Sequence, residues 1–165
     1  MDSIRVGIGF DVHPFVEGRP LVLGGVNVPH SRGLDGYSDA DVLCHAIADS
    51  LLGAIALGDI GVHFPSSDER WRGVSSLKLL SRVVEMIRSE GFAPANVDST
   101  VVAQEPLLAP YVEGMRKRIC SALSLGRERV GVKATTTDSL GFCGRGEGIA
   151  ALAVSLVRPF EADWK

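Results

Sequence analysis

The chain has 165 residues, of which 45% are hydrophobic and 22% charged, so it can form one globular domain with a proper core. Its net charge of −3 argues against a nucleic-acid-binding protein, because such a protein needs a basic patch. Three cysteines (Cys44, Cys120 and Cys143) lack zinc-knuckle spacing, and their odd number fits a reducing compartment. The most apolar stretch, 42–57, contains polar residues and is not a membrane span. We expect a single domain over residues 1–165, in the cytoplasm, with no nucleic-acid or membrane partner.

The first half of the chain predicts a strand, a hairpin and a helix, in that order. The strand covers Ile4–Phe10, whose two glycines allow another backbone to come close. Leu21–Leu23 and Val26–Val28, joined by two glycines, predict a hairpin with a two-residue turn. A loop over 29–37 then leads to a helix that Ser38 is expected to cap, with acids in its first turn.

The second half of the chain predicts strands interleaved with helices. The end of the first helix at 58–61 is followed by a loop over 63–68. Apolar periodicity then predicts the remaining elements, which are helices over 75–90 and 108–123 and strands over 97–103, 130–134 and 149–157. This alternation indicates an α/β or α+β fold in two layers.

Asp11, His13 and His45 form a candidate metal site. Alternate residues of a strand point to the same face, so Asp11 and His13 can reach one point in space. Two imidazoles and one carboxylate would suit Zn²⁺ with one open position, where a substrate oxygen can be polarised. The competing interpretation is that these residues are only caps or turn residues. Asp49, one helical turn after His45, is either a partner for its second ring nitrogen or a surface acid.

Two further stretches suit phosphate chemistry. Thr135, Thr136 and Thr137 close a strand beside Asp138, and they are either a shelf of hydroxyl donors or strand residues chosen for β-propensity. On the first interpretation, Asp138 holds Mg²⁺ or Mn²⁺ together with substrate phosphates. A turn over 141–148 packs four glycines around Arg145 and is either an anion-binding turn or purely structural; it is not a Walker A loop.

Taken together, these stretches resemble the 2-C-methyl-D-erythritol 2,4-cyclodiphosphate synthase family. The matching motifs run through the whole chain in one order and comprise Gly9–His13, Ser38–Asp41 with His45, 51–54, 58–61, Phe64-Pro65, Ala103-Gln104, 133–137, Gly141-Phe142 and 144–148. Several motifs in one order are far more specific than any single one.

The resemblance implies a fold, an assembly and a reaction. The implied fold is α+β, a two-layer mixed β-sheet with helices packed on one face in a ferredoxin-like βαβ arrangement. The implied assembly is a homotrimer with active sites at subunit interfaces. The implied reaction is an intramolecular phosphoryl transfer on a cytidine diphosphate-type substrate, 4-diphosphocytidyl-2-C-methyl-D-erythritol 2-phosphate. Its 2-phosphate attacks the β-phosphorus, so that the cyclic diphosphate forms and CMP leaves.

The resemblance also implies roles for individual residues. Asp11, His13 and His45 would hold Zn²⁺, Asp138 would help hold a second divalent ion, and Thr136 would stabilise the transition state. The cytidine diphosphate side would be lined by Ala103, Gln104, Glu105, Pro106, Leu107, Leu108 and Ala109 together with Thr135, Thr136, Thr137 and Asp138. The erythritol part would contact Asp59, Ile60, Gly61, Phe64, Pro65, Ser66, Ser67 and Asp68. Phe142 and Arg145 would lie near the substrate or the threefold axis.

Three positions depart from the family pattern. Tyr37, beside the substrate-binding Ser38, stands where the family usually has a histidine that steadies the transition state. Asp138 replaces a glutamate, and Leu107 replaces a lysine. These departures keep open a non-catalytic trimer that binds a diphosphate metabolite. A separate alternative is a metal-dependent phosphohydrolase on the same site, in which water replaces the internal phosphate nucleophile.

Overall fold

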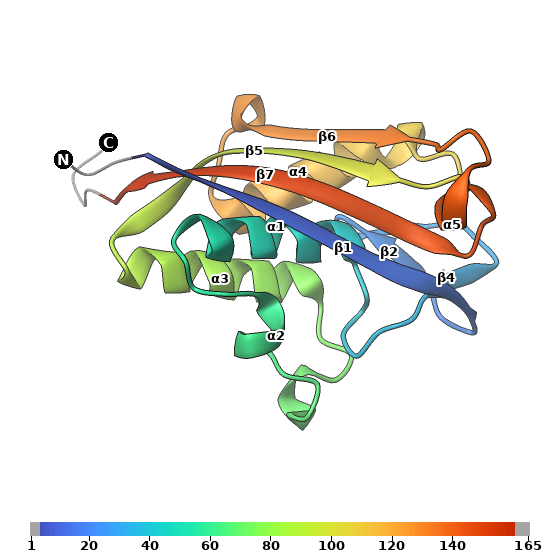
Figure 1. Ribbon diagram of the computed structural model, residues 1–165, viewed down its shortest axis with the longest axis horizontal. Helices are drawn as coiled ribbons and strands as arrows, with labels where there is room; N and C mark the ends of the chain where they lie inside the picture. The colour runs from blue at the N-terminus through green and yellow to red at the C-terminus, as the bar shows by residue number, and fades with distance from the viewer. Residues whose placement is uncertain (1–3, 161–165) are drawn as a thin grey trace.

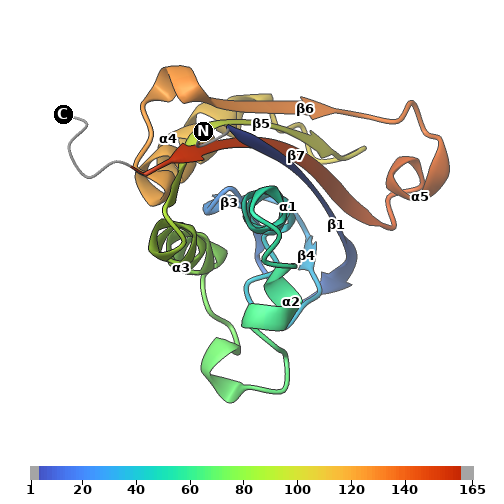
Figure 2. The same cartoon turned by 60° about the vertical axis from the view of Figure 1, so that its left-hand side comes forward.

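The computed structural model describes residues 4–160 and shows one curved mixed sheet with helices on one of its faces (Figures 1 and 2). The strand order is β4-β1-β7-β5-β6. These strands span Arg32–Leu34 (β4), Arg5–Glu17 (β1), Gly148–Pro159 (β7), Phe92–Val102 (β5) and Val130–Thr135 (β6). Only β5 and β6 pair in parallel within this sheet; the other neighbours are antiparallel. A separate hairpin pairs β2 (Leu21–Leu23) with β3 (Val26–Val28), as predicted.

Three helices cover the inner face of the sheet. They are α1 (Val42–Ala54), α3 (Ser76–Ser89) and α4 (Val112–Leu123). Shorter pieces are α2 (Ile60–His63), α5 (Gly141–Gly144) and the 3-10 turns η1 (Glu69–Trp71), η2 (Ala109–Tyr111) and η3 (Arg127–Arg129). The predicted α+β class with helices on one face is confirmed, and β5-α4-β6 supplies the parallel βαβ unit. Within residues 4–160, no helix combines the length and the apolar character that crossing a membrane requires.

The hydrophobic core lies between the sheet and these helices. Helix α1 is at its centre, and eleven of its thirteen residues are buried. Helix α3 contributes an apolar stripe that includes Leu80, Val83 and Ile87, and α4 contributes Met115 and Ile119. The periodicity that predicted these two helices is therefore the periodicity of their buried faces.

Two glycines bring β1 against the backbone of α1. A Cβ atom on Gly7 would lie 2.0 Å from the carbonyl oxygen of Ser50, and one on Gly9 would lie 1.9 Å from that of Ala46. Only glycine fits at either position, so the predicted close approach is confirmed. Because the same strand face continues to Asp11 and beyond, the side chains that follow Gly9 on this face are directed toward α1.

The opposite face of β1 is apolar, although no helix covers it. Val6, Ile8 and Phe10 are 63%, 69% and 54% exposed, and the pattern continues onto β7. We call this surface the outer face; it consists of Val6, Ile8, Phe10, Val12, Leu152 and Val154. A contiguous exposed apolar surface of this kind is typical of an interaction site.

The start of α1 differs from the prediction. Asp41, not Ser38, is the N-cap, and its carboxylate accepts a hydrogen bond from the backbone N–H of Cys44. Ala40 has a left-handed φ of +57°, so the chain turns sharply there and the helix starts two residues later. Two other expectations were wrong: the loop predicted over 29–37 contains β4, and the helix end predicted at 58–61 overlaps the separate short helix α2, because α1 already ends at Ala54.

Replacing Asp41 with alanine is expected to lower the free energy of unfolding by about 3 kcal/mol, through loss of a helix cap and of buried hydrogen bonds. Asp41 is fully buried, and it also accepts hydrogen bonds from the backbone N–H groups of Gly24 and Gly25 at 2.9 and 2.6 Å. Urea unfolding at one fixed protein concentration measures the effect. Asp98→Ala, at an exposed carboxylate paired with Lys133, is the matched control. Equal unfolding midpoints for the two variants would contradict this role of Asp41.

Candidate metal and substrate site

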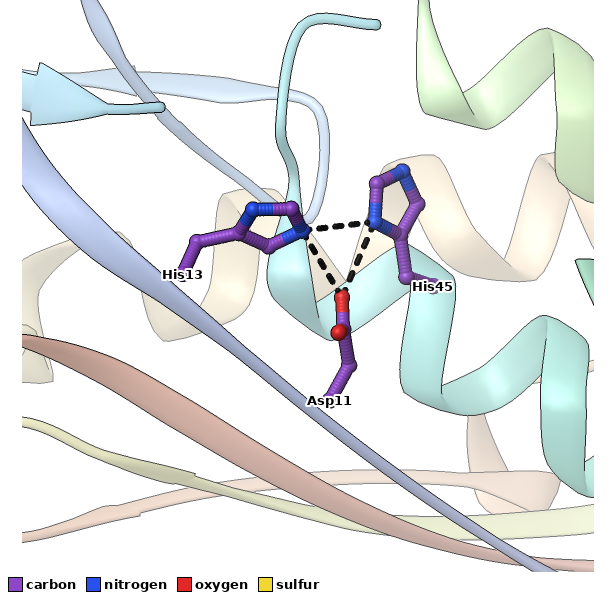
Figure 3. A group of neighbouring side chains, drawn as sticks. All are labelled: Asp11, His13 and His45. Carbon is purple, nitrogen blue, oxygen red and sulfur yellow. Dashed lines mark hydrogen bonds and ion pairs between the residues drawn. The ribbon is translucent and has the colours of Figure 1, made fainter. Parts of the chain in front are cut away.

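The side chains of Asp11, His13 and His45 converge on one point between β1 and α1 (Figure 3). The Nε2 atom of His13 lies 2.9 Å from Oδ2 of Asp11 and 3.1 Å from Nδ1 of His45. The third side of the triangle, from Nδ1 of His45 to Oδ2 of Asp11, is 3.0 Å. Ligand atoms around one tetrahedral zinc ion lie roughly 3.3 to 3.5 Å apart, so this triangle needs to open by only a few tenths of an ångström.

The far nitrogens of both imidazoles are held by other groups. Nδ1 of His13 donates to the backbone carbonyl of Asp35 at 2.5 Å, which leaves the lone pair of Nε2 directed at the cluster. Nε2 of His45 lies 2.8 Å from the hydroxyl of Ser76 and 3.1 Å from that of Ser38. The Ser76 hydroxyl in turn donates to the carboxylate of Asp39. This outer layer of contacts orients metal-binding histidines, and the structure places it around both rings.

The charges of the three side chains support one another. Burial raises the pKa of the Asp11 carboxyl, but hydrogen bonds and charges from His13 and His45 outweigh it and hold the pKa well below its usual range. Burial likewise lowers the pKa of His13, and the hydrogen bond and charge of Asp11 outweigh it, so this pKa lies above its ordinary value. The carboxylate therefore stays ionised and stabilises positive charge beside it.

Asp49 plays neither of the roles that we predicted for it. Its carboxylate accepts a hydrogen bond of 2.8 Å from the backbone N–H of Ile60, at the start of α2. The second nitrogen of His45 is instead occupied by Ser76 and Ser38, as described above. Asp49 therefore holds α2 against α1, and through α2 it positions the wall of the cavity described next.

A cavity of about 390 Å³ opens in front of the three ligand side chains. Many of the predicted site residues line it together, namely Asp11, His13, Tyr37, Ser38, His45, Ile60, Gly61, Phe64, Pro65, Ser66 and Ser67. Asp59 and Asp68 lie beside it and cap the turns that follow them. The Asp59 carboxylate accepts from the N–H of Val62 at 3.1 Å, and that of Asp68 accepts from the N–H of Arg70 at 3.0 Å.

The sequence reasoning missed two residues of this cavity, Trp71 and Leu79. Trp71 packs edge-on against Phe64, with ring centroids 5.0 Å apart. Its indole nitrogen and the hydroxyl of Tyr37 are buried, and neither has a hydrogen-bond partner within residues 4–160. Buried donors are normally paired, so these two are available to a bound molecule. The feature of the sequence that could have identified Trp71 is that a tryptophan stands in an otherwise polar loop.

The predicted nucleotide-side residues line a second cavity, of about 300 Å³. It is formed by Ala103, Gln104, Pro106, Leu107, Leu108, Ala109, Ala134, Thr135 and Thr136. None of these residues lines the first cavity. Within one chain, the proposed phosphate shelf and the metal ligands are therefore parts of different hollows.

The remaining predicted residues lie outside both cavities. Thr137 and Phe142 line a third hollow of about 210 Å³. Glu105 forms an ion pair with Arg32, and Arg145 forms one with Glu147. Asp138 is exposed, accepts a hydrogen bond of 3.3 Å from the hydroxyl of Thr136, and has a left-handed φ of +51°. Strained backbone of this kind concentrates at functional sites.

Known proteins match this chain closely in sequence and in structure. The synthase named 2-C-methyl-D-erythritol 2,4-cyclodiphosphate synthase from Syntrophobacter fumaroxidans is 62% identical over 155 residues, which are 94% of this chain and 98% of that protein. The protein of the same name from Pelotomaculum thermopropionicum is 59% identical, over 93% of this chain and 95% of that protein.

Solved structures agree with these sequence relatives. IspF of Plasmodium falciparum, in complex with CDP, superposes with a TM-score of 0.84 at 30% identity, over 98% of this chain and 99% of that one. The bifunctional IspDF of Campylobacter jejuni gives a TM-score of 0.93 at 42% identity, over 98% of this chain and 44% of that one. A profile of the YgbB family matches residues 4–158. The chain therefore belongs to the YgbB family, together with these cyclodiphosphate synthases.

Proposed function

We propose that the chain converts 4-diphosphocytidyl-2-C-methyl-D-erythritol 2-phosphate to 2-C-methyl-D-erythritol 2,4-cyclodiphosphate and CMP, in non-mevalonate isoprenoid biosynthesis. Its class is therefore a lyase that acts on a phosphorus–oxygen bond. The observation that carries this proposal is the convergence of Asp11, His13 and His45 at the mouth of a cavity, in a chain 62% identical to a synthase of that name.

The reaction requires that the two phosphate groups are positioned and that their negative charge is neutralised. An oxygen of the 2-phosphate forms a bond to the β-phosphorus, the bond from that phosphorus to the bridging oxygen breaks, and the electron pair leaves with CMP. The enzyme forms no covalent bond, so its task is to hold two mutually repelling phosphates in line. Tyr37 and Thr136 would donate hydrogen bonds to the oxygens on which charge grows.

Metal ions would supply the positive charge that this acidic chain lacks. We assign Zn²⁺ to Asp11, His13 and His45, because two nitrogens and one carboxylate oxygen leave a fourth tetrahedral position open. A divalent ion held there would carry a net charge of about +1 after the carboxylate is counted, and it would supply Lewis-acid stabilisation to a phosphate oxygen. We assign a second ion, Mg²⁺ or Mn²⁺, to Asp138 together with substrate phosphates, because such ions favour carboxylate and phosphate oxygens.

We further propose that the protein works as a homotrimer, with each active site between two subunits. Two observations support this arrangement. The cavity with the metal ligands and the cavity with Thr135 and Thr136 share no residue, which is the arrangement expected if a second chain supplies one half of each site. The outer face of β1 and β7 is apolar and has no cover within one chain.

We place the protein in the cytoplasm as one functional domain over 1–165. All three cysteines are buried and free, as expected in a reducing compartment. The substrate and the product are small polar phosphate esters, so the reaction needs neither a nucleic acid nor a membrane.

A product assay tests the proposed reaction. The purified protein is given the cytidine substrate with Zn²⁺ and Mg²⁺, and ³¹P NMR follows the phosphorus signals. We expect CMP and the cyclic diphosphate in equal amounts. CMP with an uncyclised 2,4-bisphosphate, formed by attack of water on the β-phosphorus, would instead indicate the phosphohydrolase, and the absence of any turnover would indicate a non-catalytic binding protein.

Replacing Tyr37 with histidine is expected to raise the turnover rate by roughly tenfold, the amount by which a charge-assisted hydrogen bond exceeds a neutral one. The Tyr37 hydroxyl is a buried donor without a partner among the described residues, and an imidazolium at this position is a stronger one. Steady-state kinetics with CMP release as readout measure the change. Tyr37→Phe, which removes only the hydroxyl, is the matched control and should be slower than wild type. A slower Tyr37→His variant would contradict the donor role.

A further inference from the structure

One arginine, Arg19, holds the backbone of a short segment beside the metal ligands. Arg19 lies in the turn between β1 and β2. Its Nη1 and Nη2 atoms donate to the backbone carbonyl oxygens of Gly36 and Ser38, each at 2.5 Å. The carboxylate of Asp35, 3.7 Å from the guanidinium, adds a longer ion pair. We call residues 35–38 the bridging segment; it follows β4 and contains no helix or strand.

Arg19 accounts for two of the four backbone carbonyl groups in the bridging segment. Of the other two, that of Asp35 accepts from Nδ1 of His13, and that of Tyr37 accepts from the backbone N–H of Gly73 at 2.8 Å. Every carbonyl of the segment therefore has a partner, as backbone groups away from bulk water require. Because the segment belongs to no helix or sheet, these contacts decide where it lies.

The bridging segment contacts both metal-binding imidazoles. Figure 3 shows that each ring turns one nitrogen toward the cluster and the other away from it. The outward nitrogen of His13 donates to the carbonyl of Asp35 at 2.5 Å, and that of His45 lies 3.1 Å from the hydroxyl of Ser38. Gly36 lies against the first ring, since a Cβ atom there would be 3.0 Å from Cε1 of His13. A shift of the segment would therefore displace the partners of both rings together.

The backbone of Arg19 is fixed from the other side. Gly33 of β4 packs against the turn so closely that a Cβ atom on it would lie 2.5 Å from the carbonyl oxygen of Arg19 and 2.4 Å from that of Pro20. Only glycine fits at this position. The guanidinium thus extends from an anchored turn to the bridging segment, and it connects the two.

We propose that Arg19 is a positioning residue of the metal site, which orients His13 and His45 through the bridging segment. This inference rests on the proposed function, in which the two histidines bind Zn²⁺. Groups that orient ligand histidines change metal affinity by about ten- to a hundredfold when they are removed. A guanidinium suits this role because its donors form a rigid planar fork, which fixes two carbonyl groups relative to each other.

Titration of the metal-free protein with Zn²⁺, in competition with a chromophoric chelator, tests this role without any substrate. We expect Arg19→Gln to weaken Zn²⁺ binding by about tenfold or more. Arg19→Lys keeps the charge but loses the fork, so its affinity should be intermediate. In histidine-labelled NMR spectra of the metal-free protein, the proton on Nδ1 of His13 should exchange with water faster in Arg19→Gln than in wild type.

Arg116→Gln is the matched control. The side chain of Arg116, on α4, is 30% exposed, as is that of Arg19. It also donates to two backbone carbonyls, those of Val130 and Arg127, and pairs with Glu113 at 3.8 Å. Both glutamine variants should lower the urea midpoint, but only Arg19→Gln should lose Zn²⁺ affinity. The role of Arg19 is overturned if Arg19→Gln binds Zn²⁺ as tightly as wild type, or if Arg116→Gln weakens binding equally.

The product assay separates this inference from the proposed reaction. If wild type forms the cyclic product and Arg19→Gln keeps its full Zn²⁺ affinity, the reaction stands and the role of Arg19 is refuted. If Arg19→Gln loses affinity while wild type shows no turnover, the role of Arg19 stands and the proposed reaction is refuted. A wild type that binds no Zn²⁺ would contradict the metal assignment and this role together.

Discussion

Replacing His45 with alanine is expected to remove the bound metal and to slow CMP release by about a thousandfold, the scale of losing a main electrostatic stabiliser of the transition state. In the proposed zinc site, His45 supplies one of the three ligand atoms found among the described residues, and its ring is held in place by Ser76 and Ser38 at the far nitrogen. Elemental analysis of the purified variant gives the metal stoichiometry, and the product assay gives the rate.

The control for this variant is His63→Ala. His63 lies in α2, and its Nε2 atom contacts the carbonyl oxygen of Leu57 at 2.8 Å, outside the metal cluster. This variant should therefore keep its metal. Full metal content in His45→Ala, with a circular dichroism spectrum like that of wild type, would refute the ligand assignment.

Replacing Ile8 with aspartate is expected to dissociate the assembly and to abolish activity. Ile8 is 69% exposed in a single chain, at the middle of the outer face, and in the proposed trimer neighbouring subunits cover it. A buried unpaired carboxylate costs several kcal/mol, and a symmetric assembly carries that cost once in every subunit. Sedimentation velocity measures the mass of the assembly, and CMP release measures activity.

Lys78→Asp provides the comparison for the outer-face variant. Lys78 is exposed on α3, on the helical side of the molecule, so an added carboxylate there should leave the assembly intact. A trimer that forms normally with Ile8→Asp would show that the outer face is not the interface. An active monomer would show that one chain contains a complete site.

The sequence was sufficient to predict the elements with a clear period and the meeting of Asp11, His13 and His45 in one candidate metal-binding group. Helices α3 and α4 were predicted to within a few residues, because their apolar stripes are their buried faces. The pairing of Asp11 with His13 follows from the two-residue period of a strand. Their meeting with His45 depended on Gly7 and Gly9, whose close contact with α1 the sequence only suggested.

The sequence was misleading where a tertiary contact decides the role of a polar residue. Serine is a residue type that often caps helices, yet the hydroxyl of Ser38 contacts His45, and it is Asp41 that caps the helix. Asp49 has the right spacing for His45, yet it bonds to the backbone of Ile60. In each case several partners were within reach, and packing selected one.

The alternation of apolar and polar residues in β1 gives the wrong inner face for a different reason. Apolar residues normally mark the inner face of a strand, but here Val6, Ile8 and Phe10 point away from the helices. The polar and glycine positions face α1 instead. A single sequence does not tell a core from an interface, because both exclude water in the same way.

Co-expression of two inactive variants, His45→Ala and Thr136→Ala, tests most directly whether metal ligands and phosphate shelf from different subunits form one site. In a random mixture, a site between two subunits is intact when the Thr136→Ala subunit supplies the metal ligands and the His45→Ala subunit supplies the threonines. Each of these two conditions holds for half of the sites, so about one quarter of wild-type activity should return. A mixture that stays as inactive as the two separate variants would show that each chain builds its site alone.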